Sequence, residues 1–286
     1  TYPRCWRPAQ HFAGLRQADS LTGHCLRRAS PVKREPRAAT GQIVLHGLSL
    51  NNLRDVSVSI PMGVLTVVAG VAGSGKSTLV NRLLPRHCPQ AILIDQKGLG
   101  GTRRSSVASY IGVLDEIRAG FAKVSAQPAS LFSSNAQGAC PACKGLGVIQ
   151  TDLAFMDSVE TPCDVCGATG FNEAARAINW MGCNIAQVLA LSVEQALRHF
   201  EACGGISEPL QRLYSVGLGY LSLGQRLSTL SGGERQRLKL ATRLAEQGSL
   251  YIFDEPTSGL HMSDVSRLRA IFDDLTRQRA TVIVVE

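Results

Sequence analysis

The chain has 286 residues, of which 44% are hydrophobic and 18% are charged, a balance that is typical of a globular protein and excludes a disordered one. No apolar run reaches the roughly 18 residues of a membrane span, and the polar N-terminus lacks the apolar core of a secretory signal. We therefore expect a cytoplasmic protein with no membrane partner, and the formal net charge of +8 leaves nucleic acid binding open.

Residues 1–40 hold most of the positive charge, with eight lysines or arginines against two acidic residues. Their Pro/Arg-rich composition predicts a basic linker. The other 246 residues carry a net charge of only +2, so charge alone does not identify the partner. Because the chain begins with Thr1 rather than methionine, we expect a fragment of a longer protein.

Short β-branched runs follow Gly41, and IVLHGLSL and VSVSI predict two strands. A third predicted strand, Val64–Gly70, runs into GVAGSGKS and then into the helical sequence TLVNRLL. A Gly-x₄-Gly-Lys-Ser sequence between a strand and a helix predicts a phosphate-binding P-loop, and a chance glycine-rich turn would not keep every part in register. The expected ATP-binding residues are Gly70, Val71, Ala72, Gly73, Ser74, Gly75, Lys76, Ser77 and Thr78.

Each part of this loop has a physical role. Gly73 and Gly75 let backbone N–H groups approach phosphate oxygens, and the helix N-terminus adds partial positive charge. Lys76 is expected to reach the β- and γ-phosphates and act in catalysis, while the Ser77 hydroxyl is expected to bind Mg²⁺.

Four of the nine cysteines form two Cys-x-x-Cys pairs with 19 residues between them. Four thiolates at this spacing suit tetrahedral Zn²⁺, and four protein ligands would make the site structural rather than catalytic. Free buried cysteines and disulfides are the alternatives. The predicted ligands are Cys140, Cys143, Cys163 and Cys166.

Two motifs near the end of the sequence complete an ATP site. In LSGGERQR, Ser231 is a good helix N-cap, and the glycines that follow leave the helix N-terminus open to an anion. In SLYIFDEP, a buried strand at Leu250–Phe253 ends in Asp254, expected to bind Mg²⁺, and Glu255, expected to orient or deprotonate the attacking water. After the TSGLH turn, a helix is predicted with one apolar face made of Leu268, Ile271, Phe272 and Leu275.

The order of these motifs resembles that of the ATP-binding cassette (ABC) ATPases. The resemblance implies an α/β P-loop ATPase core, residues 41–97 and 226–286, around an inserted zinc-bearing signature domain, residues 98–225. It implies that Gln96, in ILIDQKGLGG, is the catalytic Q-loop glutamine. It also implies that the signature residues act in trans, on ATP bound to a second cassette: Ser231, Gly232, Gly233 and Glu234.

The inserted segment resembles the UvrA family, in particular its second cassette. The resemblance lies in GGTRRSSVASYIGVLDEIRAGFA, FSSNAQGACPACKGLGVI and LYSVGLGYLSLGQRLSTLSGGE. It implies ATP hydrolysis coupled to recognition of damaged double-stranded DNA in nucleotide excision repair, with a second cassette and a UvrB-like protein as partners. It implies an ATPase with no nuclease site of its own.

Alternatives remain open at this point. The segment 97–225 has nine basic and ten acidic residues and is not a basic surface, which leaves room for a UvrA-like paralogue in self-resistance to DNA-binding drugs. A membrane transporter ATPase and a non-catalytic nucleotide-binding module are further readings. The sequence stops at TVIVVE, directly before the switch histidine that the resemblance implies, so we expect weak hydrolysis by this chain alone.

Overall fold

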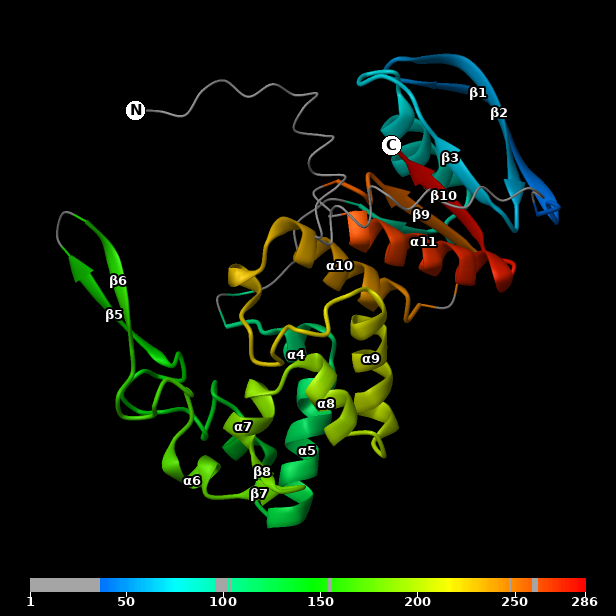
Figure 1. The fold of residues 1–286 in the computed structure, drawn as a ribbon. Helices are drawn as coiled ribbons and strands as arrows, with labels where there is room; N and C mark the ends of the chain where they lie inside the picture. Colours follow the sequence, from blue (N-terminus) through cyan, green and yellow to red (C-terminus); the bar gives the residue numbers. More distant parts are fainter. Residues whose placement is uncertain (1–36, 96–101, 103, 154–155, 247, 259–261) are drawn as a thin grey trace, which may run out of the picture. The chain divides into compact units, whose positions relative to one another are not determined.

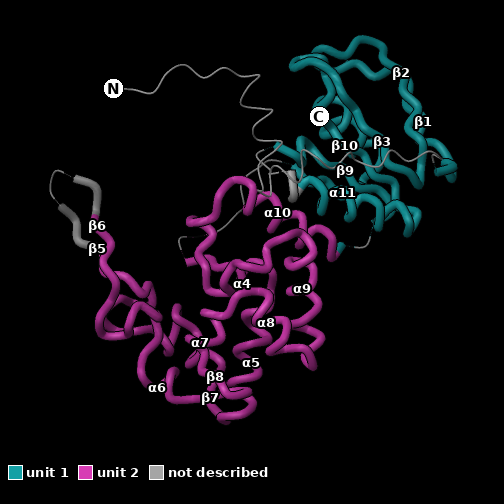
Figure 2. Tube along the Cα trace, in the orientation of Figure 1, with its two compact units in different colours: residues 1–97, 246–286 teal, residues 98–245 magenta. Residues whose placement is uncertain are grey.

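The computed structural model describes residues 37–95, 102, 104–153, 156–246, 248–258 and 262–286 (Figure 1). Nearly all of the expected linker and the whole of Gln96 lie outside this part of the chain. The chain divides into two compact units, unit 1 (residues 1–97 and 246–286) and unit 2 (residues 98–245), which Figure 2 colours separately.

The second boundary of the inserted segment differs from the one taken from the sequence. Residues 226–245 were assigned to the ATPase core, whereas the structure groups them with unit 2. The physical reason is packing, since helix α10 (Gly232–Arg243) contacts helix α9 (Gly204–Ser215). The segment before α10 is also hydrogen-bonded within unit 2, where the Leu227 N–H donates to the Ser105 carbonyl over 2.9 Å.

Unit 1 is built on a four-stranded parallel sheet in the order β3–β10–β9–β4. The strands are β3 (Leu65–Val68), β10 (Thr281–Val285), β9 (Leu250–Asp254) and β4 (Ile92–Ile94). All of β10 and the first four residues of β9 are buried, as expected for a parallel sheet covered on both faces. The strands predicted around Val64–Gly70 and at Leu250–Phe253 are confirmed.

Different elements cover the two faces of this sheet. On one face, Ile252 and Ile283 share a core with hairpin β1 (Gly41–Leu50) and β2 (Leu53–Met62) and with helices η1 (Thr78–Leu83) and α3 (Leu84–His87). Strand side chains alternate, so Phe253 points to the other face. There its ring lies 4.7 Å from that of Phe272 on α11 (Met262–Arg277). The predicted buried face of that helix is confirmed at Leu268, Phe272 and Leu275, while Ile271 is half-buried.

Unit 2 is mainly helical. Besides α9 and α10 its helices are α4 (Val107–Tyr110), α5 (Val113–Ser125), η2 (Ala129–Phe132), α6 (Glu173–Arg176), α7 (Ile185–Ala190), α8 (Val193–His199) and η3 (Leu227–Thr229). Two antiparallel hairpins complete it, β5 (Val148–Leu153) with β6 (Met156–Pro162) and β7 (Asn179–Trp180) with β8 (Cys183–Asn184).

An aromatic cluster forms part of the core of unit 2. The Phe121 ring stacks on Phe132 at 5.0 Å and meets the Trp180 ring edge-on at 5.5 Å, and Trp180 contacts Phe200 at 5.3 Å. Gly120 makes room for this packing, because a Cβ there would lie 2.3 Å from the Trp180 ring. In the part of the chain that the structure describes, no helix combines the length and the apolar character needed to cross a bilayer.

Candidate functional site

The P-loop connects β3 to η1 in unit 1, in the strand–loop–helix order that the sequence predicts. Two of its glycines adopt left-handed backbone conformations, with φ of +80° at Gly73 and +96° at Gly75. At Gly75 a Cβ would also lie 2.7 Å from Leu53 Cδ2. The Lys76 ammonium donates to the loop's own carbonyls, at Gly70 and, over 3.1 Å, at Val71. The loop therefore curves around its lysine, with backbone amides and a cation gathered at one point.

The helix that the sequence predicts after the loop is present, and part of it is a π-helix. This segment is Thr78–Leu83, and the Leu84 N–H donates to the Leu79 carbonyl, five residues back. Pro85 follows within the first turn of α3. Proline has no N–H to donate to the carbonyl of Asn81, so the α-helical ladder is interrupted there in any case.

Asp254 lies at the same edge of the sheet as the P-loop. The register pairs Val68 with Val285 and Val285 with Asp254, so the carboxyl ends of β3 and β9 are level with one strand between them. At about 4.8 Å per strand, these ends lie about 10 Å apart, a gap that a hydrated divalent ion can bridge. The Asp254 carboxylate accepts a 2.5 Å hydrogen bond from Asn81 on η1, which orients it toward the helix that follows the P-loop.

Glu255 turns the chain sharply out of the sheet. It has a left-handed φ of +46°, which is unusual for a non-glycine residue, and its N–H donates to the Val285 carbonyl over 2.9 Å. Its side chain is exposed at the strand end. The chain thus places a carboxylate just beyond β9, at the edge of the sheet that carries the P-loop.

The LSGGE sequence forms the N-terminus of α10, with Ser231 as the predicted N-cap. Ser231 and Glu234 form a reciprocal capping box, in which the Ser231 N–H donates to Glu234 Oε2 over 2.7 Å and the Glu234 N–H donates to Ser231 Oγ over 3.3 Å. A Cβ at Gly232 would meet nothing within 4 Å. The first turn of this helix therefore presents open backbone.

Tyr220 is a residue of this region that the sequence did not indicate. Its hydroxyl donates to Glu234 Oε1 over 2.6 Å, so both oxygens of the carboxylate are held. Burial alone would raise the pKa of Glu234, but the hydrogen bonds from Tyr220 and Ser231 outweigh it and hold this pKa below its ordinary value. Burial and the neighbouring Glu234 raise the pKa of Tyr220.

The four predicted metal ligands come together in unit 2, with all four sulfur atoms buried and within 4.8 Å of one another. The Cys140 and Cys163 sulfurs are 4.0 Å apart, and those of Cys143 and Cys166 are 3.7 Å apart. Disulfide sulfurs lie about 2.0 Å apart, so these cysteines are not bridged. A tetrahedral zinc with Zn–S bonds of about 2.3 Å requires sulfurs about 3.8 Å apart, and the cluster fits this distance.

The two Cys-x-x-Cys turns have the same internal geometry. In each turn the two residues after the second cysteine are left-handed, Lys144 and Gly145 in the first turn and Gly167 and Ala168 in the second. In each turn a later glycine N–H donates to the second sulfur, Gly147 to Cys143 over 3.1 Å and Gly170 to Cys166 over 3.3 Å.

The turns also exchange backbone hydrogen bonds. The Cys163 N–H donates to the Gly147 carbonyl, and the Cys140 N–H donates to the Gly170 carbonyl, both over 2.9 Å. The cluster is therefore a pseudo-symmetric pair in which each turn completes the other.

The thiols of the first turn have opposite pKa shifts. The backbone N–H of Cys143 lowers the pKa of Cys140 to about 7, against the opposing effect of burial. Burial raises the pKa of Cys143 to about 11. A divalent cation would oppose the second shift, because it favours the thiolate that it binds.

The structure thus brings the predicted residues together in two groups. The P-loop, Asp254 and Glu255 lie in unit 1, and the signature residues and the four cysteines lie in unit 2. Asn81, Tyr220 and Arg226 contact these groups but were missed. Their partners lie at least 14 residues away in the sequence and belong to no spacing motif.

A parallel sheet with a P-loop and an acidic strand end at one edge is the arrangement of a P-loop ATP-binding domain. The family model described as ABC transporter matches residues 53–258. The chain therefore belongs to the ABC transporter family.

Within this family the chain is similar to UvrA proteins. It is 39% identical to UvrABC system protein A of Streptomyces avermitilis and 40% identical to that of Staphylococcus aureus, over 95% of its own length. It spans only 30% and 32% of those proteins. The crystal structure of UvrA2 from Deinococcus radiodurans matches 96% of this chain and 37% of that one, at 40% identity and a TM-score of 0.83.

Proposed function

We propose that this chain is an ATP-hydrolysing cassette of a UvrA-like protein and that its ATP cycle is coupled to recognition of damaged double-stranded DNA in nucleotide excision repair. One observation carries the proposal: the signature helix and the Cys₄ cluster lie in one compact unit, inserted into an ABC-type core. The 39–40% sequence identity of the chain to UvrABC system protein A supports the same proposal.

In unit 1, Gly70–Thr78 would bind the ATP phosphates through backbone N–H groups and the Lys76 ammonium. Ser77 and Asp254 would hold Mg²⁺, which when bound neutralises charge on the β- and γ-phosphates. Glu255 would accept a proton from the attacking water, whose oxygen bonds to the γ-phosphorus as the bond to ADP breaks. Gln96 would orient that water, and the products are ADP and phosphate.

In unit 2, the open first turn of α10 would bind the γ-phosphate of ATP held by a second cassette. The capping box fixes Ser231 and Glu234, while open space around Gly232 leaves the first N–H groups of the helix accessible. Fixed donors of this kind stabilise charge in the transferring phosphoryl group without reorganisation. The second cassette is either another copy of this one or another part of the full-length protein.

The Cys₄ cluster would hold one structural Zn²⁺, because four sulfurs in tetrahedral spacing leave no open coordination position. The ion would link the two turns and would not take part in hydrolysis. The proposed partners of the whole protein are double-stranded DNA and a UvrB-like protein. The name of the relatives supports this proposal, because it makes protein A one part of a UvrABC system.

The test uses the full-length protein. Phosphate release and binding to damaged duplex DNA are measured for the wild type, for Glu255→Gln and for Asp274→Asn, a matched carboxylate-to-amide change at an exposed side chain with no proposed role. We expect Glu255→Gln to lose hydrolysis by at least a hundredfold while retaining MgATP binding, and DNA binding to fall steeply with salt. Hydrolysis that survives in Glu255→Gln, or no response to DNA, would overturn the proposal.

A further inference from the structure

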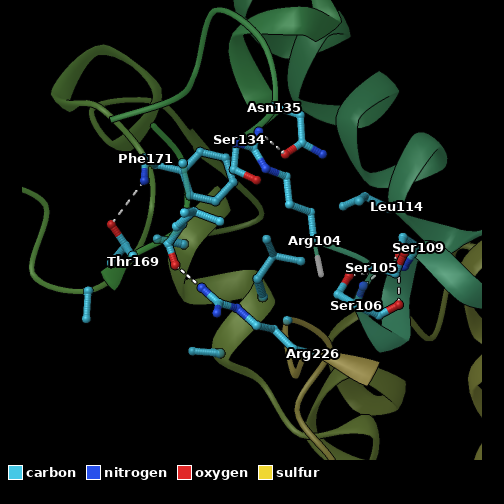
Figure 3. Close-up of a pocket in the computed structure, with 18 of the residues that line it drawn as sticks. Arg104, Ser105, Ser106, Ser109, Leu114, Ser134, Asn135, Thr169, Phe171 and Arg226 are labelled. Atoms are coloured by element: carbon cyan, nitrogen blue, oxygen red, sulfur yellow. Dashed lines mark hydrogen bonds between the residues drawn. The ribbon is translucent and has the colours of Figure 1, made fainter. Parts of the chain in front are cut away.

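A cleft of about 760 Å³ lies within unit 2. One side is formed by turn residues of the Cys₄ cluster, among them Leu146 and Gly147, and another by the segment that leads to the signature helix, which includes Arg226 and Thr229. Figure 3 labels two arginines in this cleft, Arg104 and Arg226, which come from different parts of the chain. The two arginines have different hydrogen-bond partners, so Arg226 supports a hypothesis and Arg104 serves as its control.

Arg226 connects the signature segment to the cysteine cluster. Its guanidinium donates to the carbonyl oxygen of Leu146. The other end of the same peptide group is the Gly147 N–H, which donates to Cys143 Sγ over 3.1 Å. One rigid, planar peptide unit thus has a metal-ligating sulfur at its N–H and a permanent cation at its carbonyl. Cys143 and Arg226 are therefore joined through this one peptide group.

The backbone of Arg226 is held by hydrogen bonds just before the signature helix begins. Arg226 pairs with Ser106 in an isolated bridge, and its carbonyl accepts from the Thr229 hydroxyl over 2.8 Å. The 3-10 turn Leu227–Thr229 follows at once, and Ser231 caps α10 two residues later. Only four residues therefore separate the arginine from the N-cap of the signature helix.

Arg104 contacts the same cleft without making this connection. Its guanidinium donates to Asn135 Oδ1 over 3.1 Å, and it bonds neither to the cysteine turns nor to the segment before α10 in the part of the chain that the structure describes. It has the same charge as Arg226 and lines the same cleft, although Arg104 is exposed and Arg226 is half-buried, so it is a charge-matched control.

We propose that Arg226 is a positioning residue that couples metal loading of the Cys₄ cluster to the order of the signature helix N-terminus. With the four sulfurs held by a metal, the Leu146 carbonyl stays in place and Arg226 anchors the segment before Ser231. When the metal leaves, the turn that carries Leu146 loosens and the anchor is lost. The proposal rests on the proposed function for the identity of the metal and for the role of α10, and it extends that function to regulation.

The test is hydrogen–deuterium exchange of the backbone amides of residues 227–235 in the full-length protein, with zinc bound and after removal by a chelator. It compares wild type with Arg226→Met, which keeps the apolar stem but has no donor, and with Arg104→Met. Zinc content is measured first by elemental analysis. A protein without metal overturns the proposed zinc site and the coupling together, whereas a zinc-loaded protein whose exchange does not respond to chelation overturns the coupling alone.

We expect chelation to speed exchange in this segment about tenfold or more in the wild type and in Arg104→Met. In Arg226→Met exchange is already fast with zinc bound, and chelation changes it less than twofold. Arg226→Lys, which keeps the charge and one donor direction, gives an intermediate response and serves also if Arg226→Met does not fold. The same acceleration by chelation in wild type and in the Arg226 variants would overturn the proposal.

Discussion

Two glycines of the cysteine turns offer a quantitative test of the Cys₄ geometry. Gly145 and Gly167 each lie within two residues of a second-position cysteine, and both have left-handed φ, of +81° and +59°. Their surroundings differ. A Cβ at Gly145 would lie 1.7 Å from the Ser134 carbonyl oxygen, whereas a Cβ at Gly167 would meet nothing within 4 Å.

The expected cost of alanine follows from these distances. Both substitutions place a side chain in a left-handed conformation, which costs roughly 1–2 kcal/mol. An ordinary carbon–oxygen contact is about 3.3 Å, so only Gly145→Ala also requires two backbone segments to move apart by about 1.6 Å. Overpacking of this kind costs roughly 1–3 kcal/mol. Metal binding and folding of the turns are linked, so the additional cost of Gly145→Ala over Gly167→Ala should appear as a factor of about 5 to 150 in zinc affinity.

The assay is competition for zinc with a chromophoric chelator at neutral pH, with both variants and the wild type measured under the same conditions. We expect Gly167→Ala to bind zinc about tenfold more weakly than the wild type. Gly145→Ala should bind zinc more weakly than Gly167→Ala by a further factor of about 5 to 150. Equal affinities in the two variants, or weaker binding by Gly167→Ala, would refute the close approach of Ser134 to the first turn.

Three further substitutions test the surrounding contacts. Tyr220→Phe should lower the free energy of unfolding by about 1 kcal/mol in denaturant titration at pH 7. The pKa of Glu234 is lowered in the folded protein, so the stability that its carboxylate contributes is lost as pH falls through that lowered pKa. Without the Tyr220 hydroxyl the folded pKa is less lowered, and the variant should lose this stability at a higher pH than the wild type does. Gly120→Ala should lower stability by about 1–3 kcal/mol in thermal unfolding, because its Cβ would lie 2.3 Å from the Trp180 ring. Asn81→Ala should weaken MgATP binding about tenfold in calorimetric titration, since it frees the aspartate at the end of β9, and unchanged binding would contradict that role.

The local geometry of the candidate ATP and metal residues could be predicted because it depends on a few neighbouring residues. Gly73 and Gly75 are needed for left-handed backbone, Ser231 for the N-cap of α10, and the paired cysteines for a tight turn that brings two sulfurs together. These requirements are local, so a short motif records them. The same holds for Asp254, because a strand end fixes the edge of the sheet at which its side chain lies.

The contacts that hold these residues in place were not predictable in the same way. Arg226 and Leu146 are 80 residues apart, and Asn81 and Asp254 are 173 apart. No local periodicity relates such residues, and only the folded chain brings them together. The end of unit 2 at residue 245 depends on contacts of the same kind, because α10 packs on α9.

The structure also accounts for the 19 residues between the two cysteine pairs. Hairpin β5–β6 fills this interval, and its base pairs Val148 with Pro162, directly beside the two residues that exchange the 2.9 Å bond between the turns, Gly147 and Cys163. The hairpin therefore closes at the cysteine cluster itself. The hairpin ladder offsets the loop entropy of the long interval. The geometry of the four sulfurs depends on the register at the hairpin base and not on the length of the interval, so the spacing of two residues within each pair is the part of the pattern that specifies the cluster.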